Sequence, residues 1–506
     1  MPCVPHLVAH LMANPLLYSR EAGGVGPGRG AQWQLIAVFK RGGKMCRFAN
    51  ALLLFVCLES TLWAVEPIAI GGRLEPLLDD FLLAEKSGDV RQVMHPPVPA
   101  EVAFVTGKPW EGNTSAYYTI FRDGDLLRMY YRGSHADQQR KPTHREVTCY
   151  AESRDGIHWT RPDLGLFEFE GSKQNNIVWD GIGTHCFAVF KDANPACPPE
   201  ARYKAISRGR PHGKKGLYIF QSPNGVNWKL MAADPVITNG YFDSQNLAFW
   251  DTYARTYRAY HRTFVDGVRA IMTQTSTNYR EWTKPSLLQY AANTPREHLY
   301  TNAVFNYPGA EHILVGFPSR YLPQQNSRVE PIMMTSRDGL RFHRWPDPVV
   351  PETAPKDRGG NRSNYMTWGM VSLPGRPHEF SVYATEAYYE GPDCRVRRFV
   401  FRKDGLVSLS ADEGAVATHA ITFAGKELVL NYRTRNRDGS IRVEVQDADG
   451  RPLQGLALAD CRPLVGDQIE QRVVWRQDAD LSRWEGKPIR LHFEIQHADL
   501  FSLRFQ

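Results

Sequence analysis

The stretch Ser153-Arg154-Asp155-Gly156-Ile157-His158-Trp159 decides the fold, because versions of it return along the chain. In each full version a serine leads an aromatic residue by six positions, with Asp or Asn between them. Further copies begin at Ser222, Ser276 and Ser336, and a shortened copy occupies residues 403–406. An Asp-Gly or Asn-Gly pair between apolar runs is the strongest short-range signal for a β-hairpin. The sequence therefore repeats a unit that contains a hairpin.

A second series of segments interleaves with the first and also favours strands. Its members, and the strands expected after them, are 114–121 and 126–132, 184–190 and 202–208, 243–250 and 256–262, 300–305 and 312–318, and 366–371 and 379–385. Two series in the same order give five units, each long enough for a four-stranded sheet, and radial repetition of such sheets is a β-propeller. We therefore predict an all-β chain with a five-bladed β-propeller. A pair of β-sandwiches with coincidental hairpins is the alternative.

The pattern changes near residue 411. Alternating strands are expected over 427–432, 441–446, 490–495 and 501–505, separated by Asp-Gly and Asn-rich turns. We predict a propeller over residues 65–410 and a small β-sandwich over 411–506. Asp447 and Asp449, in the turn after residues 441–446, are typical of a plain hairpin, with a calcium site as the alternative.

The beginning of the chain has the pattern of a targeting segment. Lys44 and Arg47 precede an apolar run over 48–58, and Ala64 offers a cleavage point. The run is too short for a membrane helix. We interpret residues 1–64 as a leader with a misplaced start, Met45 being the true one, followed by a signal peptide. The mature protein is expected to be secreted or periplasmic, with no membrane span; a buried apolar strand is the alternative.

Composition limits the functional classes. Hydrophobic residues are 42% and charged residues 23%, as in soluble globular proteins. Residues 1–64 carry +4 of the formal net charge of +7, so +3 remains on the rest, which excludes a nucleic-acid partner. The chain has no Cys-x-x-Cys pair, so it lacks a zinc knuckle or thioredoxin motif. We expect no metal and no cofactor. Cys186 and Cys197 are candidates for a disulfide, or for two free thiols.

Five blades, a signal peptide and a C-terminal β-sandwich resemble the five-bladed β-propeller glycoside hydrolases, which include invertases, arabinanases, xylosidases and mannoside phosphorylases. The chain is most similar in style to secreted bacterial proteins of the family-32-like and family-43-like kind. The resemblance covers about residues 70–410 and implies a carbohydrate substrate. The invertase signatures Asn-Asp-Pro-Asn, Arg-Asp-Pro and Glu-Cys are absent from the sequence. Catalytic residues therefore cannot be transferred by motif and have to be inferred from position.

Candidate catalytic carboxylates follow from blade geometry. The start of the first strand and the end of the second share one face of a propeller, where side chains converge on the axis. Glu111 and Asp243 precede or open first strands, and Glu386 ends a second strand. Asp80, with its neighbour Asp79, precedes the first blade, where related propellers place a catalytic Asp. Each has an alternative role: substrate binding without catalysis for Glu111, a turn cap for Asp243, an ion pair for Glu386 and an N-terminal turn for Asp80.

The residues expected around them suit a sugar site. Arginines at the ends of second strands match carboxylate or sulfate groups, and aromatic rings pack on sugar faces. The candidate binding residues are Arg132, Arg208, Arg262, Arg320, His185, His261, Trp110, Tyr300 and Trp368.

We therefore expect a secreted glycoside hydrolase acting on an oligo- or polysaccharide, with an anionic substrate indicated by the arginines. Two carboxyl groups would face each other across the scissile bond, with Glu386 as the acid and Asp243 or Asp80 as the base or nucleophile. The alternatives are a carbohydrate-binding propeller without catalysis, and a lyase or phosphorylase acting on the same ligands.

Overall fold

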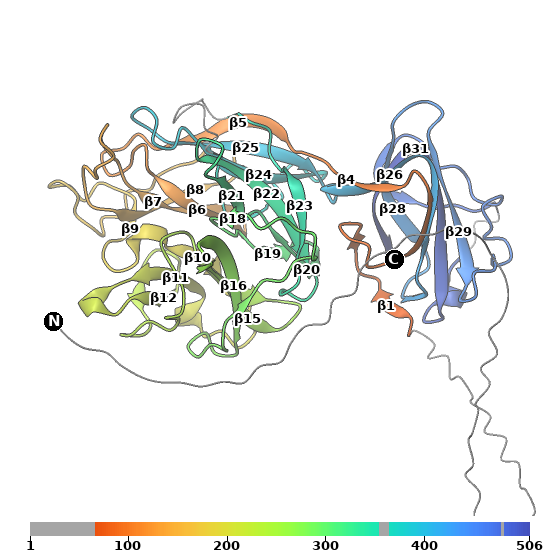
Figure 1. Ribbon diagram of the computed structural model, residues 1–506, viewed down its shortest axis with the longest axis horizontal. Helices are drawn as coiled ribbons and strands as arrows, with labels where there is room; N and C mark the ends of the chain where they lie inside the picture. Colours follow the sequence, from red (N-terminus) through yellow and green to blue (C-terminus); the bar gives the residue numbers. More distant parts are fainter. Residues whose placement is uncertain (1–65, 354–363, 477–479) are drawn as a thin grey trace, which may run out of the picture. The chain divides into compact units, whose positions relative to one another are not determined.

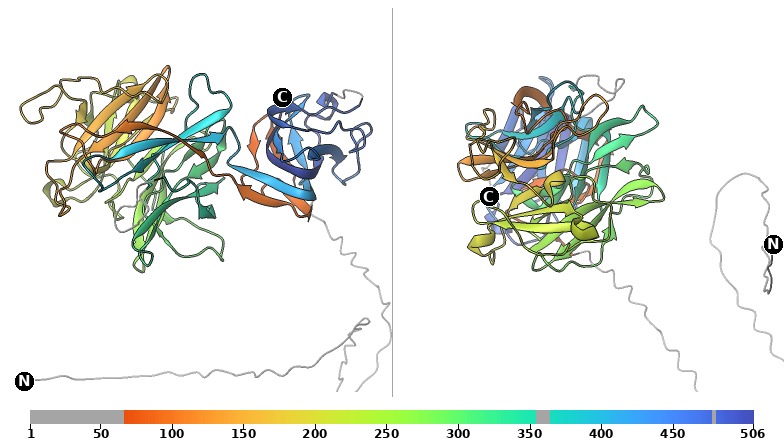
Figure 2. Two further views of the ribbon diagram at one scale, coloured as in Figure 1. Left: turned by 90° about the horizontal axis from the view of Figure 1, so that it is seen from above. Right: turned by 90° about the vertical axis from the view of Figure 1, so that its left-hand side faces the viewer.

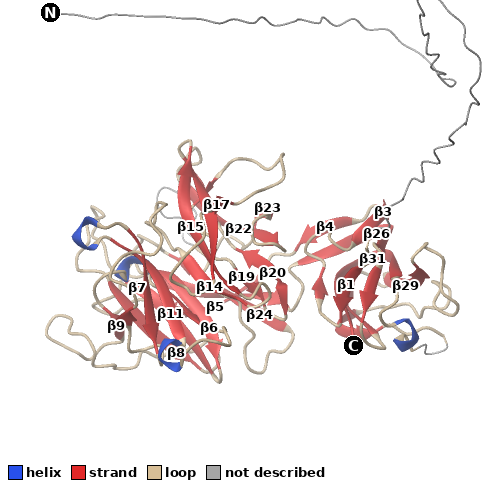
Figure 3. Ribbon diagram, turned by 90° about the horizontal axis from the view of Figure 1, so that it is seen from below, coloured by secondary structure: helices blue, strands red, loops and turns tan. Residues whose placement is uncertain are grey.

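A computed structural model describes residues 66–353, 364–476 and 480–506. These residues form strands and loops, and their only helices are four short 3-10 turns (Figure 3). The 3-10 turns are η1 (Thr184–Cys186), η2 (Pro199–Ala201), η3 (Pro211–Gly213) and η4 (Ser482–Trp484). Within the described ranges, no helix has the length and apolarity needed to cross a membrane. The predicted leader, residues 1–64, lies outside them.

Four blades are each built from one run of chain, with the innermost strand first (Figure 1). The first and second blades comprise β6 (Ala116–Asp123), β7 (Leu126–Gly133), β8 (Val147–Ser153) and β9 (Ile177–Trp179), and β10 (Ala188–Lys191), β11 (Tyr203–Gly209), β12 (Gly216–Ser222) and β13 (Lys229–Leu230), respectively. The third blade comprises β14 (Leu247–Asp251), β15 (Thr256–Val265), β16 (Val268–Ser276) and β17 (Ser286–Leu287). The fourth blade comprises β19 (Phe305–Tyr307), β20 (Ala310–Gly316), β22 (Arg328–Ser336) and β23 (His343–Pro348), and β18 (His298–Leu299) and β21 (Ser319–Leu322) extend it. The pairing is antiparallel throughout these sheets.

The fifth blade closes the ring with strands from distant parts of the chain. β24 (Glu379–Glu386) pairs with β25 (Arg395–Arg402), and β25 pairs with β5 (Val98–Val105). Met366 and Val371 form single bridges to β24 on its inner side. The orange β5 lies beside the cyan β25 in Figures 1 and 2. The five-bladed propeller predicted from the repeats is therefore confirmed.

The source of the outermost fifth-blade strand differs from the prediction. The shortened repeat at residues 403–406 was expected to lead into it, but β26 (Val407–Thr418) leaves the propeller and joins another sheet. β5 takes the outer position, so a segment before the first repeat completes the last one.

That other sheet has ten strands and a hydrophobic core of its own. Its members are β1 (Ile68–Gly71), β2 (Glu75–Pro76), β3 (Leu83–Gly88), β4 (Arg91–Met94), β26, β27 (Ile421–Phe423), β28 (Leu428–Thr434), β29 (Ser440–Asp447), β30 (Asp467–Arg472) and β31 (Ile489–Phe505). The long β31 pairs with β26, β27, β28, β29 and β2, so the strands form one continuous sheet. Residues 68–94 belong to this sheet, whereas the sequence placed them at the start of the propeller.

The Ser and Asp or Asn side chains of the repeated turn accept the same backbone hydrogen bonds in its four full copies, and the indole bond recurs in the copy that ends at Trp228. Ser153 Oγ accepts the Gly156 N–H at 2.8 Å, and Asp155 Oδ1 accepts the N–H groups of Ile157 and His158, both at 2.8 Å. The Trp159 indole donates to the Gly156 carbonyl at 3.1 Å. These local bonds explain why Ser, Asp or Asn and an aromatic residue recur at fixed spacing.

The cysteines of the described residues are all free. Cys186 is buried and Cys197 half-buried, so the structure shows the free-thiol alternative for this pair. Asp447 Oδ1 accepts the N–H groups of Asp449 and Arg451 at 2.9 Å, which is the arrangement of a plain hairpin turn.

Candidate functional site

Two adjoining hollows lie at the face of the propeller where first strands begin and second strands end. One has a volume of about 680 Å³ and the other about 380 Å³. Glu146, His185, Arg208 and Asp243 line both, and we call the two hollows together the axial site. Side chains from several blades therefore converge here, as the strand geometry predicts.

Asp243 lines both hollows, and contacts of the neighbouring residues fix the position of its segment. The buried Phe242 anchors its segment, and the Tyr241 N–H donates to the Arg262 carbonyl at 2.9 Å. The Arg262 guanidinium forms an ion pair with Asp243 and donates to the Tyr241 carbonyl at 3.2 Å. Because the Asp243 side chain is 57% exposed, this carboxylate remains accessible to a ligand.

Glu146 is the second carboxylate of the axial site, and sequence reasoning missed it. It directly precedes β8, and a third strand starts on the same face where the second ends. Only starts of first strands and ends of second strands had been considered. Its position directly before the third strand of the blade is the sequence feature that indicates Glu146.

The surroundings of Glu146 hold it ionised. Its carboxylate lies 2.9 Å from His185 Nδ1 and 3.4 Å from the Arg132 guanidinium. Burial alone would raise the pKa of Glu146, but the hydrogen bond with His185 and the charges of His185, Arg132 and Arg208 lower it to about 2. Burial lowers the pKa of His185 to about 4, against the opposing effect of Glu146. At neutral pH the pair is therefore a carboxylate and a neutral imidazole.

Arg132 joins these groups to the tyrosines of the site. It donates to the Thr114 carbonyl at 2.6 Å and to the Tyr388 hydroxyl at 3.1 Å. Its guanidinium also lies 4.9 Å from the centre of the Tyr117 ring. Arg132 is therefore a fixed part of the lining of the smaller hollow, and its side chain is only 4% exposed.

Aromatic rings surround the smaller hollow, which Tyr117, Tyr300, Tyr388 and Tyr389 line. Tyr117 has a φ of 58°, a left-handed conformation that is unusual for a tyrosine, and the β6–β7 register shifts beside it. Such bulges redirect a side chain and are common next to functional sites. The bulge thus accounts for the place of Tyr117 in the hollow.

Two of the predicted catalytic carboxylates are buried elsewhere in ion pairs. Glu386 has no exposed side-chain surface and accepts hydrogen bonds from Arg395 and Arg397, both at 2.7 Å. Glu111 is equally buried, accepts a short hydrogen bond from the Tyr131 hydroxyl and pairs with Arg161 at 2.8 Å. Neither residue lines the axial site. Glu386 thus forms the ion pair that was its alternative, whereas the ion pair of Glu111 with Arg161 was not expected.

Asp80 and Arg320 also lie outside the axial site. Asp80 precedes β3, has a 61% exposed side chain and pairs with Lys86 at 2.6 Å, while its neighbour Asp79 pairs with Arg337 at 2.7 Å. Arg320, in β21, is bound by Glu330 and by Glu297.

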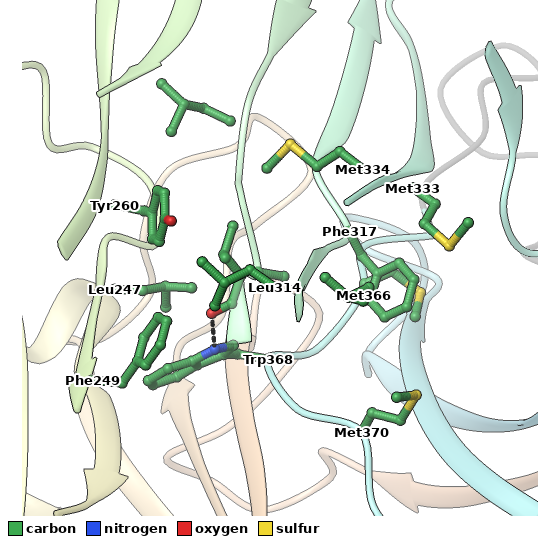
Figure 4. Close-up of a cluster of buried hydrophobic side chains, with 14 of the residues drawn as sticks. Leu247, Phe249, Tyr260, Leu314, Phe317, Met333, Met334, Met366, Trp368 and Met370 are labelled. Carbon is green, nitrogen blue, oxygen red and sulfur yellow. Dashed lines mark hydrogen bonds between the residues drawn. The ribbon is translucent and has the colours of Figure 1, made fainter. Parts of the chain in front are cut away.

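Three further predicted binding residues are placed apart from the axial site. His261 is buried one position before Arg262, on the opposite side of β15, and lies 2.7 Å from the Gln274 amide nitrogen. Trp110 donates to the Asn176 side chain at 2.7 Å. Trp368 packs in the propeller core beside Phe249 and donates to the Val304 carbonyl at 2.8 Å (Figure 4).

The structure thus brings together six of the predicted residues: Asp243, Arg132, Arg208, Arg262, His185 and Tyr300. It adds Glu146, Tyr117, Tyr388, Arg210 and Lys215. Among the described residues, no group of three or more His, Cys, Asp or Glu side chains is arranged to hold a metal ion. The site's chemistry therefore consists of two carboxylates among arginines and tyrosines.

Comparison with known proteins gives similarity of fold. No family model and no curated protein matches the sequence. Among solved structures, a β-1,2-mannobiose phosphorylase from Listeria innocua, in complex with β-1,2-mannobiose, is 11% identical with a TM-score of 0.42, over 60% of this chain and 95% of that one. An endo-arabinase from Bacteroides thetaiotaomicron is 10% identical with a TM-score of 0.39, over 62% and 99%. A glycosyl hydrolase from Bacteroides ovatus is 12% identical with a TM-score of 0.38, over 66% and 97%. The five-bladed propeller itself is established by the strand pairing of this chain.

Proposed function

We propose that the protein is a glycoside hydrolase that cleaves an oligo- or polysaccharide in the axial site. The observation that carries this proposal is the pair Asp243 and Glu146, the two acidic residues that line both hollows. Glycoside hydrolysis uses two carboxyl groups that flank the scissile bond. The tyrosine rings that line the smaller hollow supply surfaces on which sugar rings pack.

The two carboxylates suit different roles. Glu146 is held ionised by His185 and Arg132, so it acts as the base, or as the group that stabilises positive charge on the sugar. Asp243 is the more exposed of the two, and it acts as the proton donor to the leaving oxygen once a bound ligand takes the place of Asp243 at Arg262, because the free ion pair favours the carboxylate. This assignment replaces Glu386 as the acid, because Glu386 is enclosed by two arginines away from the hollows.

The experiment compares variants of the full chain on a glycan panel. Neutral, uronate-bearing and sulfated glycans are incubated with the wild type, Asp243→Asn and Glu146→Gln, and new reducing ends are quantified. The matched control is Asp266→Asn, which removes an exposed carboxylate that pairs with Arg296 at 2.9 Å outside the site. We expect release by the wild type and the control, and a loss of 100-fold or more in the other two, on the order of the effect of general acid–base groups.

Two results would overturn hydrolysis in favour of the alternatives. Release that requires inorganic phosphate identifies a phosphorylase. Binding of a glycan without release from any member of the panel identifies a carbohydrate-binding propeller. Circular dichroism of each variant separates these results from unfolding.

Export is part of the same proposal, on the basis of the basic residues, apolar run and Ala64 among residues 44–64. The mass of the mature chain from the culture medium or periplasm of its host should correspond to a start near Val65. A chain that retains residues 45–64 would contradict processing.

A further inference from the structure

The larger hollow of the axial site carries more positive charge than its carboxylates balance. Four cationic side chains line it, Arg208, Arg210, Lys215 and Arg262, against Glu146 and Asp243. Glu146 is already matched by Arg132, which belongs to the smaller hollow. The charge near the carboxylates is therefore positive before a ligand binds.

Arg208 stands out because its guanidinium is half-buried and forms no side-chain hydrogen bond or ion pair with any described residue. Other arginines at strand ends are paired: Arg320 with Glu330, and Arg397 with Glu386. Lys215 likewise has no ion pair within the described ranges, and its ammonium lies 5.2 Å from the Tyr241 ring. Arg208 acts on Glu146 through its charge alone, and neither Arg208 nor Lys215 is held in an ion pair by a described residue, so both can bind a ligand in the hollow they line.

Arg262 adds a second, independent observation. Its side chain is 3% exposed, and two of its nitrogens are used by Asp243 and by the Tyr241 carbonyl. The third, Nη1, is buried without a hydrogen-bond partner. Buried donors are normally satisfied, so an unpartnered one beside a hollow points to an acceptor supplied by a ligand.

The Arg262 guanidinium is also fixed in orientation. It lies 5.4 Å from the Phe264 ring and 5.2 Å from the Tyr300 ring. A planar guanidinium held between rings presents its N–H groups in a set direction, which suits the oxygen pair of a carboxylate or sulfate.

We propose that Arg208, Arg262 and Lys215 form a subsite for an oxyanion, a carboxylate or sulfate, that is carried by the saccharide itself. This inference rests on the proposed function and names its substrate class, an acidic glycan. A hollow of about 680 Å³ lined by Tyr241 and Phe264 has room and apolar surface for a sugar ring together with its charged substituent. A free phosphate ion alone would leave most of this space empty.

The subsite has a consequence for catalysis. An oxyanion bound at Arg262 competes with Asp243 for the guanidinium and places a like charge beside it, and both effects favour the protonated form of this carboxyl group. A substrate with an acidic group thereby favours the protonated Asp243 that proton donation requires. A neutral glycan would bind without this effect.

The test measures binding separately from cleavage. The full chain is applied to an array of neutral, uronate-bearing and sulfated oligosaccharides, and the best acidic ligand and its neutral counterpart are then titrated by calorimetry. Inorganic phosphate is titrated alone. We expect the wild type to bind the acidic saccharide at least tenfold more tightly than the neutral one, and the two acidic classes on the array identify the oxyanion.

Variants assign the selectivity to residues. Arg208→Gln should weaken binding of the acidic saccharide at least tenfold and leave the neutral one unchanged, since Arg208 has no protein partner to lose. Asp243→Asn should bind the acidic saccharide more tightly than the wild type because a like charge is gone. The control Arg122→Gln removes an exposed arginine at the other end of the first strand, in β6, and should change neither affinity.

Equal affinity for acidic and neutral saccharides, binding of neither class, or phosphate binding without acidic selectivity would each overturn the subsite. These results are distinguishable from failure of the proposed function. Acid-selective binding without cleavage contradicts only hydrolysis, whereas cleavage of neutral glycans without acid selectivity contradicts only the subsite.

Discussion

The Tyr383 hydroxyl donates a hydrogen bond of 2.7 Å to the Gly156 carbonyl and thereby joins the fifth blade to the repeated turn of the first. Two other blades repeat this contact with the blade that follows. Tyr130 donates to the Gly225 carbonyl and Tyr260 to the Gly339 carbonyl, both at 2.9 Å. The repeated turn is therefore a connector between neighbouring blades as well as a hairpin.

The connector predicts a severe effect of Gly156→Ala. Gly156 has a φ of +75°, and a Cβ there would overlap the Leu373 side chain and lie 2.7 Å from the Tyr383 hydroxyl. We expect the free energy of unfolding to fall by about 1–2 kcal/mol for the left-handed conformation and by about 1–3 kcal/mol more for overpacking. Urea unfolding followed by tryptophan fluorescence measures the sum.

Gly171→Ala is the matched control, since Gly171 has a φ of +83° but open space around its Cβ position. It should lose only the conformational part. Equal losses in the two variants would show that Gly156 does not connect the blades.

Glu386→Gln is expected to reduce stability rather than catalysis. The Glu386 carboxylate accepts hydrogen bonds from Arg395 and Arg397 at the end of β24, and its removal leaves both arginines without a counter-charge. Hydrogen bonds to charged groups contribute about 1.5–3 kcal/mol each, and the neutral amide keeps part of them, so a loss of about 2 kcal/mol is expected. The midpoint of urea unfolding and the activity per folded molecule are measured together.

The second measurement decides the role of Glu386. If folded Glu386→Gln loses activity as completely as Asp243→Asn, then Glu386 takes part in the chemistry and the assignment made here is wrong.

Repeats were predictable because their signals are local. The side chains of Ser153, Asp155 and Trp159 form hydrogen bonds with backbone groups of the same seven-residue turn, so their spacing alone indicates the hairpin. The closing strand β5 was not predictable in this way. Its partner β25 lies almost 300 residues further along the chain, and no local pattern in the sequence indicates that the two strands pair.

The candidate site was predictable to the extent that strand direction places a residue at one face. This rule located Asp243 and Arg208, and extending it to third strands would have located Glu146. It could not reveal whether a charge is already paired. Glu386 and Arg320 lie at strand ends as expected, but neighbouring strands supply their counter-charges.

Glu75 should make stability depend on pH in acid. Its side chain is fully buried in β2, 2.5 Å from Arg73, 3.1 Å from Arg337 and 3.2 Å from His312. Burial alone would raise the pKa of Glu75, but these partners lower it from 4.5 to about 2. Its stabilisation is complete above pH 4.5 and is lost as the pH falls towards 2, to a total of about 3 kcal/mol at 1.36 kcal/mol per pKa unit.

Urea unfolding of the wild type and Glu75→Gln between pH 2.5 and 6 measures this dependence. The variant should be less stable at pH 6 and should lose less stability on acidification. Glu200→Gln, which removes an exposed carboxylate in η2, should follow the wild type. A variant curve parallel to that of the wild type would show that Glu75 does not titrate with folding.

His185 is expected to determine the pH below which Glu146 becomes protonated. Among the groups that lower the pKa of Glu146 to about 2, the hydrogen bond with His185 is the largest, and burial opposes it. His185→Gln should therefore raise the pKa of Glu146 by about 1 unit or more, since the charges of Arg132 and Arg208 remain. In the wild type, kcat/KM should show no loss from protonation of Glu146 above pH 3, whereas the variant should lose activity at a pH at least about 1 unit higher.

The measurement is kcat/KM between pH 3 and 7 on a glycan that the wild type cleaves. His158→Gln is the control, because it removes an 85% exposed histidine that lies 2.7 Å from Asp155, outside the axial site. Its profile should match the wild type. If His185→Gln lowers kcat/KM equally at every pH, His185 positions the substrate or its neighbours without tuning Glu146. A profile unchanged in both height and shape would remove Glu146 from the catalytic pair, because its protonation would then have no effect on the reaction.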